Sequence, residues 1–248
     1  MVNMSRLRIA TAALLVSLGL LAPAAAGAKT IELGSTKTPL VAPSCPSTLK
    51  PTQCTIILTE VTALETIRDG ITYPTTVKSD GVLVAFTLGL SNLSTSRTTA
   101  KSEIKGLDAT YGGVPQASVA VLKQTSAKQR KYKVVAESPV VHLIPYLGQV
   151  AQFPLSLPLA VKRGEVIALS VPTWAPVLSI NLAPKSFAYR QGRTGKCTSA
   201  SNTPLAQRVN QSAAYNCDYP GTRLEYTATE ITNPIQTPNY VHASDVIR

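Results

Sequence analysis

The chain has few charged and few aromatic side chains. Of its 248 residues, 15% are Asp, Glu, Lys or Arg and 5% are Phe, Trp or Tyr. It contains 2 histidines, His142 and His242, and no GxSxG motif, so the usual sequence signs of nucleophilic catalysis are missing. No CxxC pair is present, and neither histidine lies near a cysteine in sequence, which argues against a zinc site. We therefore expect no catalytic residues, no metal site and no cofactor; the alternative is a calcium ion bound in a loop by turn residues such as Asp69, Asp80 or Asp218.

Good helix formers are also scarce, and we expect no α-helix. Thr, Ser, Val, Pro and Ala dominate instead, a mixture typical of strands joined by tight connections. The hydrophobic fraction of 44% is too high for a chain disordered throughout. The sequence therefore predicts an all-β protein with a substantial core.

The first 28 residues have the layout of a secretory signal peptide. Arg6 and Arg8 form a basic start, Ile9–Leu21 is almost entirely apolar or small, and Ala24–Ala28 offers small-x-small cleavage sites. The apolar run is shorter than the roughly 20 residues that a membrane-spanning helix needs. We expect residues 1–28 to be removed, no transmembrane segment to remain, and the protein to be secreted or associated with the cell envelope.

The chain is strongly basic, with a formal net charge of +11. Outside the cell, the surfaces that attract such a charge are glycans and anionic polymers of the envelope. Nucleic acid is not an expected partner of an exported protein. The alternative is that the charge serves only solubility. The sequence does not predict an oligomeric state.

An exported chain with 4 cysteines is expected to form two disulfides. Three pairings are possible. We favour Cys45–Cys54 together with Cys197–Cys217, because short loops close most easily.

The chain divides into a proline-rich extended lead-in over 29–53, a β domain over 54–232 and an irregular tail over 233–248. Within the domain, short stretches of alternating β-branched and apolar residues recur between turn residues, which predicts eight to ten strands. We expect the first and last of them, near Thr55–Thr66 and Arg223–Ile231, to pair and close the fold.

The sharpest local pattern is at 159–169, where two apolar runs flank Lys162-Arg163-Gly164-Glu165. It predicts a tight strand–turn–strand unit. The unit resembles the corresponding turn of exported jelly-roll modules, including carbohydrate-binding ones, with Glu165 where such modules often carry Asp. The chain as a whole resembles exported bacterial proteins of this kind. The resemblance implies a single antiparallel β-sandwich of jelly-roll type.

Three places combine aromatic and basic side chains that suit a glycan or a polyanion. One is the basic run at 123–133, a second is the loop leading to Cys197, and the third is the tryptophan between two prolines. The candidate ligand-binding residues are Lys131, Tyr132, Trp174, Tyr189, Arg190 and Arg193. The alternatives are a solvated hairpin, a ligand-free loop and a tryptophan that caps the core.

From these features we expect an exported, non-enzymatic binding or surface-associated protein that recognises a glycan or an anionic envelope polymer. One alternative is an enzyme that acts on polysaccharide through two carboxylates held across a cleft. The carboxylates on expected strands are Glu60, Glu65, Glu137, Glu225 and Glu230. Another alternative is a structural surface protein that assembles through edge strands.

Overall fold

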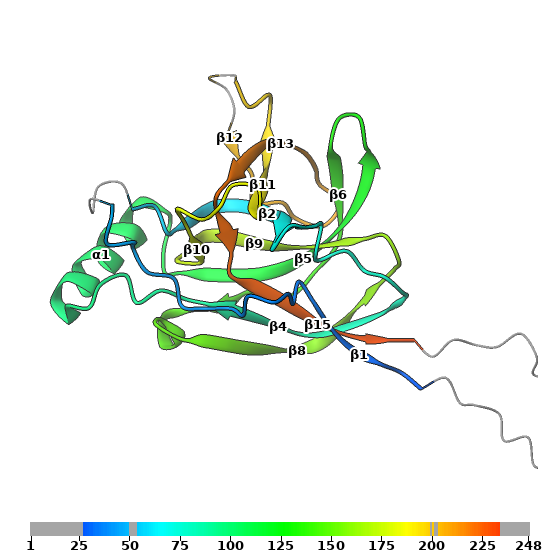
Figure 1. The fold of residues 1–248 in the computed structure, drawn as a ribbon, viewed down its shortest axis with the longest axis horizontal. Helices are drawn as coiled ribbons and strands as arrows, with labels where there is room; N and C mark the ends of the chain where they lie inside the picture. Colours follow the sequence, from blue (N-terminus) through cyan, green and yellow to red (C-terminus); the bar gives the residue numbers. More distant parts are fainter. Residues whose placement is uncertain (1–26, 50–53, 199, 201–202, 234–248) are drawn as a thin grey trace, which may run out of the picture.

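The computed structural model describes residues 27–49, 54–198, 200 and 203–233. They form a β-barrel and a flatter sheet packed together, with one helix at the end of the molecule (Figure 1). Most of the expected signal peptide and nearly all of the expected tail lie outside the described residues.

The strands are β1 (Thr30–Leu33), β2 (Leu58–Arg68), β3 (Ile71–Thr72), β4 (Gly81–Gly89), β5 (Gln116–Ser126), β6 (Lys131–Glu137), β7 (Val141–His142), β8 (Val150–Val161), β9 (Val166–Ala175), β10 (Leu178–Ser179), β11 (Phe187–Thr194), β12 (Thr203–Pro204), β13 (Ser212–Pro220), β14 (Arg223–Leu224) and β15 (Tyr226–Thr232). The helices are α1 (Arg97–Thr110) and the short 3-10 helix η2 (Ile144–Tyr146).

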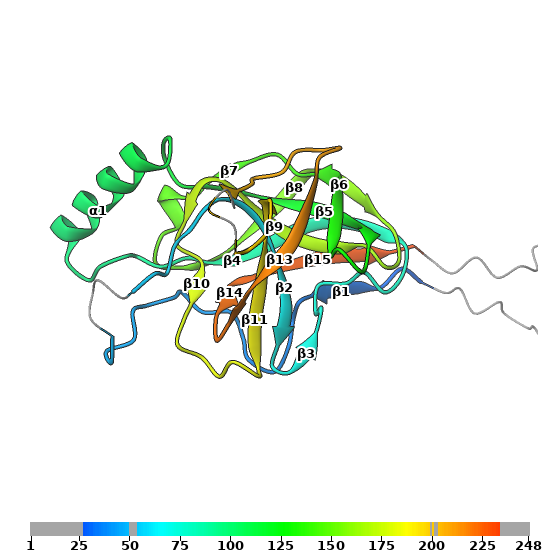
Figure 2. The same cartoon turned by 90° about the horizontal axis from the view of Figure 1, so that it is seen from above.

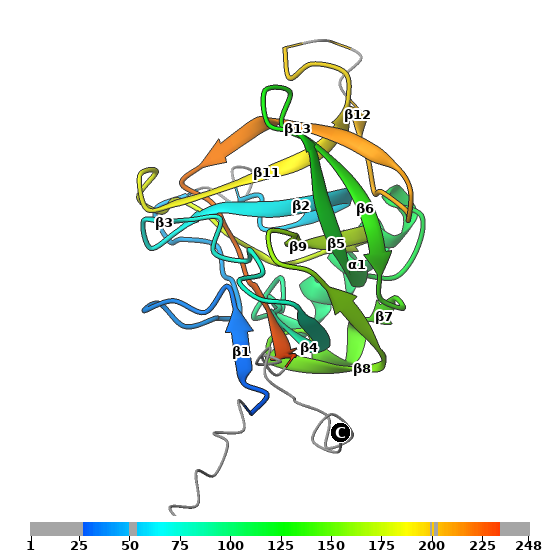
Figure 3. The same ribbon diagram turned by 90° about the vertical axis from the view of Figure 1, so that its right-hand side faces the viewer.

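Six of these strands close into an antiparallel barrel (Figure 3). Their order around the barrel is β11, β13, β6, β5, β9 and β2, and the pairing of β2 with β11 completes the circle. The all-β prediction is therefore confirmed. The jelly-roll sandwich is not confirmed, because one layer is a closed barrel rather than an open sheet.

The second layer is a four-stranded antiparallel sheet in the order β1, β15, β4, β8. Its apolar residues and those on one face of β2, β5 and β9 form the larger core. Strand β5 shows the arrangement clearly, because Val119 and Val121 lie in the larger core while Ala120 and Leu122 lie in a smaller one shared with β6 and β13. Side chains alternate along a strand, so a continuous apolar run fills two cores at once.

The expected pairing of the first and last strands is wrong. The last strand, β15, pairs with β1 and β4, whereas β2 lies in the barrel between β9 and β11. Part of the expected lead-in, Thr30–Leu33, forms β1 and occupies the edge of β15. The short strand β1 thus makes the pairing with the last strand that we expected of β2.

The unit at 159–169 joins two strands, but these strands do not form a hairpin. Strand β8 pairs with β4 in the flat sheet, while β9 pairs with β2 and β5 in the barrel. Gly164 takes a left-handed backbone with φ of 88°, and the Glu165 carboxylate accepts a 2.8 Å hydrogen bond from the Lys162 backbone N–H. The turn is therefore a corner between the two layers.

Helix α1 was not expected from the sequence. Ser96 caps its first turn, accepting a 3.4 Å hydrogen bond from the Thr99 backbone N–H. None of its residues is buried, and it projects from one end of the barrel (Figure 2). Its apolar residues Ala100, Ile104 and Leu107 recur at a helical spacing, but they are few and only partly buried, so the periodic signal in the sequence is weak.

Both favoured disulfides are present. Cys45 and Cys54 have Cα atoms 5.6 Å apart, and those of Cys197 and Cys217 are 5.2 Å apart. In the part of the chain that the structure describes, no helix is long and apolar enough to span a bilayer.

A completely buried arginine ties the lead-in to the barrel. The Arg68 guanidinium donates hydrogen bonds to the carbonyls of Gly34 at 2.5 Å, Leu224 at 2.6 Å and Tyr226 at 2.9 Å, and it forms an ion pair with the buried Glu65. Three segments that are distant in sequence thus meet at one side chain.

Arg223 makes a second connection of the same kind. Its guanidinium donates to the carbonyls of Thr38 and Pro39, both at 3.0 Å, and lies 3.5 Å from the Glu225 carboxylate. Glu225 in turn accepts a 3.2 Å hydrogen bond from the Val41 backbone N–H. Residues of the lead-in are therefore held by buried charges rather than by strand pairing alone.

Asp69 fixes the same segment from the turn after β2. Its carboxylate accepts hydrogen bonds from the hydroxyls of Thr36 at 2.6 Å and Thr38 at 2.7 Å, and from the Thr38 backbone N–H at 2.8 Å. Partial desolvation acts to raise the pKa of Asp69, but these hydrogen bonds outweigh it and lower the pKa to about 2.

We expect Asp69→Ala to lower the free energy of unfolding by about 2 kcal/mol, because the variant loses three hydrogen bonds to a charged acceptor. Urea unfolding near neutral pH measures this difference. Since the pKa of Asp69 is lower in the folded protein, its contribution is present above the unfolded value of 3.8 and is lost as the pH falls toward about 2. Equal stability of the two proteins at neutral pH would contradict the prediction.

Candidate functional site

A cavity of about 420 Å³ lies where β11 and β13 meet the start of β2 and the segment around β10. We call it the Arg193 cavity. Its lining residues are Thr55, Ile57, Leu58, Thr59, Leu178, Ile180, Tyr189, Gln191, Arg193, Pro204, Tyr219 and Thr222. Two of the six candidate ligand-binding residues, Tyr189 and Arg193, thus lie in one cavity.

Strand geometry explains why Tyr189 and Arg193 lie in the same cavity. Tyr189, Gln191 and Arg193 alternate along β11, and alternate residues of a strand share a face. The register of β11 with β13 places Tyr189 opposite Tyr219. Their rings stack with centroids 4.7 Å apart and an interplanar angle of 15°. The result is a rigid aromatic wall with polar groups at its edge.

The polar groups form a connected network. Arg193 donates to the Gln191 side-chain oxygen at 2.6 Å and to the Tyr219 hydroxyl. The Gln191 amide donates to the Tyr189 hydroxyl at 3.1 Å, and the Tyr219 hydroxyl donates to the Gln191 oxygen at 3.3 Å. Each side chain is held by its neighbours, so the guanidinium occupies a defined position before any ligand arrives.

The electrostatics of the cavity favour an anion. Among the lining residues that the structure describes, Arg193 is the one charged side chain and none is a carboxylate. Burial, reinforced by the neighbouring Tyr219, raises the pKa of Tyr189 well above its ordinary value, so this phenol stays neutral. The cavity therefore offers one positive charge, amide and hydroxyl groups, and apolar walls.

Trp174 lies elsewhere and is completely buried. Its indole N–H donates to the Asp108 carboxylate at 3.0 Å and to the Gly113 carbonyl at 3.1 Å. A buried ring has no face on which a sugar can stack. The placement matches the alternative in which this tryptophan caps the core, and its indole holds the end of α1.

The remaining candidates are not part of the Arg193 cavity. Tyr132 is buried in the smaller core, where desolvation raises its pKa to about 12, while the adjacent Lys131 is exposed. Arg190 donates to the Tyr73 hydroxyl at 3.1 Å and lies 3.3 Å from the Asp218 carboxylate. These three side chains have structural partners or face solvent, and they do not line the Arg193 cavity.

Sequence reasoning missed Gln191 and Tyr219. A usable signal was present, because Tyr219 follows Cys217 by two positions and the favoured partner Cys197 follows β11. That disulfide alone indicates that β13 lies near β11. Gln191 then shares a face with Tyr189 and Arg193 through alternation along the strand.

The strand carboxylates that we considered for glycoside hydrolysis do not line the Arg193 cavity. Glu65 and Glu225 are buried against arginines, and Glu137 accepts a 3.1 Å hydrogen bond from Ser118. Glu230 is buried on β15, where desolvation and then the nearby Asp80 raise its pKa. Across the described ranges, no group of three or more His, Cys, Asp or Glu side chains is arranged to hold a metal ion.

Comparisons with protein-family models, with curated proteins and with solved structures find no match to this chain.

Proposed function

We propose that the protein is an exported, non-enzymatic binding protein that takes an acidic sugar unit of a glycan or envelope polymer into the Arg193 cavity. The observation that carries the proposal is the position of Arg193, which Gln191 and Tyr219 hold at the edge of a stacked tyrosine pair in a cavity whose described lining residues include no carboxylate. A ligand carboxylate pairs with this guanidinium through charge-assisted hydrogen bonds.

The remaining features of the cavity support a sugar rather than a simple ion. A volume of about 420 Å³ falls within the range of small-molecule sites. Tyr219, Leu178 and Ile180 supply apolar surface against which one face of a pyranose ring packs. The Gln191 amide and nearby threonine hydroxyls offer partners for sugar hydroxyls.

Two broader features are consistent with this function. The net charge is +11 for the full chain and about +9 once Arg6 and Arg8 are removed with the signal peptide, and it draws anionic polymers toward the protein before they reach the cavity. The two disulfides are typical of proteins that work outside the cytosol. Together they support a secreted protein with binding as its role.

We expect Arg193→Met to weaken binding of an oligogalacturonate by about tenfold or more, because the ligand carboxylate loses its ionic partner. Isothermal titration calorimetry measures the affinity. Arg208→Met is the matched control, since it removes the same charge from a side chain that is 58% exposed and lies outside the cavity. It should change the affinity by no more than about twofold.

The methyl ester of the same oligosaccharide separates charge recognition from shape. It should bind the native protein about as weakly as the acid binds Arg193→Met, and added salt should weaken only binding of the acid. Equal losses in Arg193→Met and Arg208→Met show that overall charge alone drives binding, which contradicts the proposal.

A further inference from the structure

Among the described residues, Glu230 on β15 is the one carboxylate with both oxygens buried and without a hydrogen-bond partner. The residue is completely buried, and it belongs to none of the ion pairs that the described residues form. Buried carboxylates are normally paired or hydrogen-bonded, because a charge taken out of water without a partner is costly. An ionised Glu230 therefore needs a partner that the described side chains do not supply.

The Glu230 carboxylate lies beside the first residue of β4. The register of β15 with β4 places Glu230 opposite Leu83 and Thr232 opposite Gly81. A Cβ atom built on Gly81 would lie 2.8 Å from Glu230 Oε1 and 2.5 Å from the Ile231 carbonyl oxygen. Both oxygens thus approach the backbone of Gly81 at a position that a side chain there would occupy.

Asp80 brings a second carboxylate to the same place. It directly precedes Gly81 and is exposed, which gives a ligand a path from solvent. Its Oδ1 accepts a 2.8 Å hydrogen bond from the Arg163 backbone N–H, and its backbone carbonyl accepts one of 2.8 Å from the Asn233 backbone N–H. These bonds fix the turn against the end of β15, and no described residue donates a hydrogen bond to Oδ2.

The electrostatics beside Gly81 favour a cation. Burial, and then the negative charge of Asp80, raise the pKa of Glu230. Neither carboxylate forms an ion pair with a lysine or arginine of the described residues. A bound cation offsets both effects, because it pairs with the buried charge and also attracts Asp80.

We propose that Glu230 and Asp80 hold a calcium ion. Two carboxylates balance its charge, and oxygen atoms are the ligands that this hard cation takes. Water entering past Asp80, and backbone oxygens such as the Ile231 carbonyl, complete its coordination. Calcium suits such an irregular site better than magnesium, which demands near-ideal octahedral geometry. None of these residues lines the Arg193 cavity, so the calcium site is separate from the glycan site.

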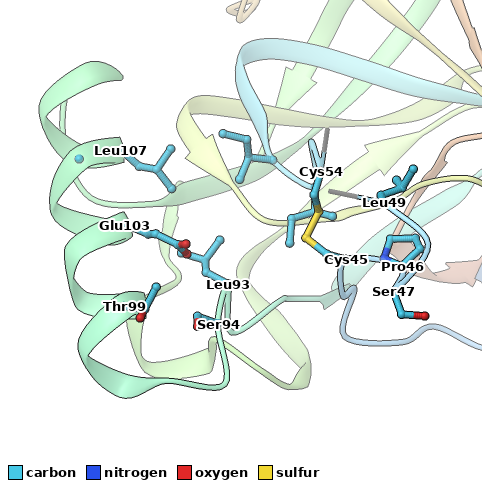
Figure 4. Close-up of a pocket in the computed structure, with 13 residues that line it drawn as sticks. Cys45, Pro46, Ser47, Leu49, Cys54, Leu93, Ser94, Thr99, Glu103 and Leu107 are labelled. Atoms are coloured by element: carbon cyan, nitrogen blue, oxygen red, sulfur yellow. A yellow bond between two sulfur atoms is a disulfide. The ribbon is translucent and has the colours of Figure 1, made fainter. Parts of the chain in front are cut away.

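Other carboxylates of the described chain do not need such a partner. Asp69 accepts three hydrogen bonds from threonines, and Asp218 lies 3.3 Å from the Arg190 guanidinium. Glu103 lines the cavity between α1 and the Cys45–Cys54 disulfide (Figure 4), but it is exposed and water solvates its charge. Of the turn aspartates suggested as calcium ligands by the sequence, Asp80 is the one beside an unpartnered buried carboxylate.

Thermal unfolding of the full protein tests the calcium site, after treatment with a chelator and near neutral pH. A site with two carboxylates should bind calcium with a Kd of about 0.1–1 mM, so about 10 mM CaCl2 should raise the unfolding midpoint by about 3–8 °C. NaCl at the same ionic strength should cause no such shift, and MgCl2 a clearly smaller one. No shift with CaCl2, or an equal shift with NaCl or MgCl2, overturns the proposal.

Three variants locate the ion. Glu230→Gln keeps the size of the side chain without its charge and should abolish the calcium shift. Asp80→Asn changes an exposed residue, so it leaves the fold intact, and it should remove at least about half of the shift. Glu137→Gln is the matched control, because it makes the same substitution as Glu230→Gln at a carboxylate that has partners, and it should keep the whole shift. A full calcium shift in Glu230→Gln or in Asp80→Asn overturns the assignment to this pair.

Discussion

Replacing Arg68 by methionine is expected to lower the free energy of unfolding by about 3–5 kcal/mol, the usual cost of breaking a buried ion pair. Methionine keeps much of the side-chain volume, so the loss comes from polar groups rather than from a cavity. The variant leaves the carbonyls of Gly34, Leu224 and Tyr226 without their donor and Glu65 without its counter-charge. Urea unfolding at about pH 8, where the unpaired Glu65 is most costly, measures the effect.

Arg208→Met is the matched control for this loss. Arg208 also pairs with a glutamate, but its side chain is 58% exposed and the distance to the Glu137 carboxylate is 3.4 Å. Exposed pairs contribute about 0–1 kcal/mol, so the control should stay close to the native stability. If the two variants prove equally stable, Arg68 does not hold the lead-in against the barrel as the hydrogen bonds indicate.

This connection was beyond the reach of the sequence. Arg68-Asp69-Gly70 indicates a turn, and both side chains are ordinary residues of a solvated loop. Their roles depend on β15 and the lead-in arriving at the same point, which is a long-range consequence of the fold. A buried arginine has no signature in its own local sequence.

The strands themselves were largely predictable, and the closure of the barrel was not. Apolar and polar residues alternate with a period of two in β2 and β4, and this alternation identifies both segments as strands. Closure depends on irregular registers, such as the shift between Ala188 and Tyr189 where β11 pairs with β2. Bulges bend and twist a strand, and no residue type marks them uniquely.

The candidate site, like the fold, was predictable from the sequence only in part. Aromatic and basic residues near Cys197 indicated Tyr189 and Arg193, which do share a cavity. The same reasoning indicated Trp174, whose flanking prolines say nothing about the buried position of its ring. Composition locates residues able to bind a ligand, but only the three-dimensional pairing of strands decides which of them face a common space.

The stability of the protein is expected to fall by about 3 kcal/mol as the pH rises from about 4.5 to about 7, because of Glu65. Burial raises the pKa of Glu65 from 4.5 to about 7, although Arg68 opposes the shift. The folded state then binds more protons than the unfolded state between these values. The stabilising contribution is complete below the unfolded pKa and is lost as the pH rises through the folded one.

Urea unfolding across this pH range should show the decline in the native protein and a much smaller one in Glu65→Gln, whose amide does not titrate. A residual decline is expected from Glu225, since burial also raises the pKa of its carboxyl. Glu137→Gln is the matched control, because it makes the same substitution at a carboxylate that is less deeply buried. A native profile that rises from pH 4.5 to 7, or one that Glu65→Gln leaves unchanged, contradicts the assignment of the decline to Glu65. Among the described residues, Glu65 is the glutamate that forms an ion pair with Arg68.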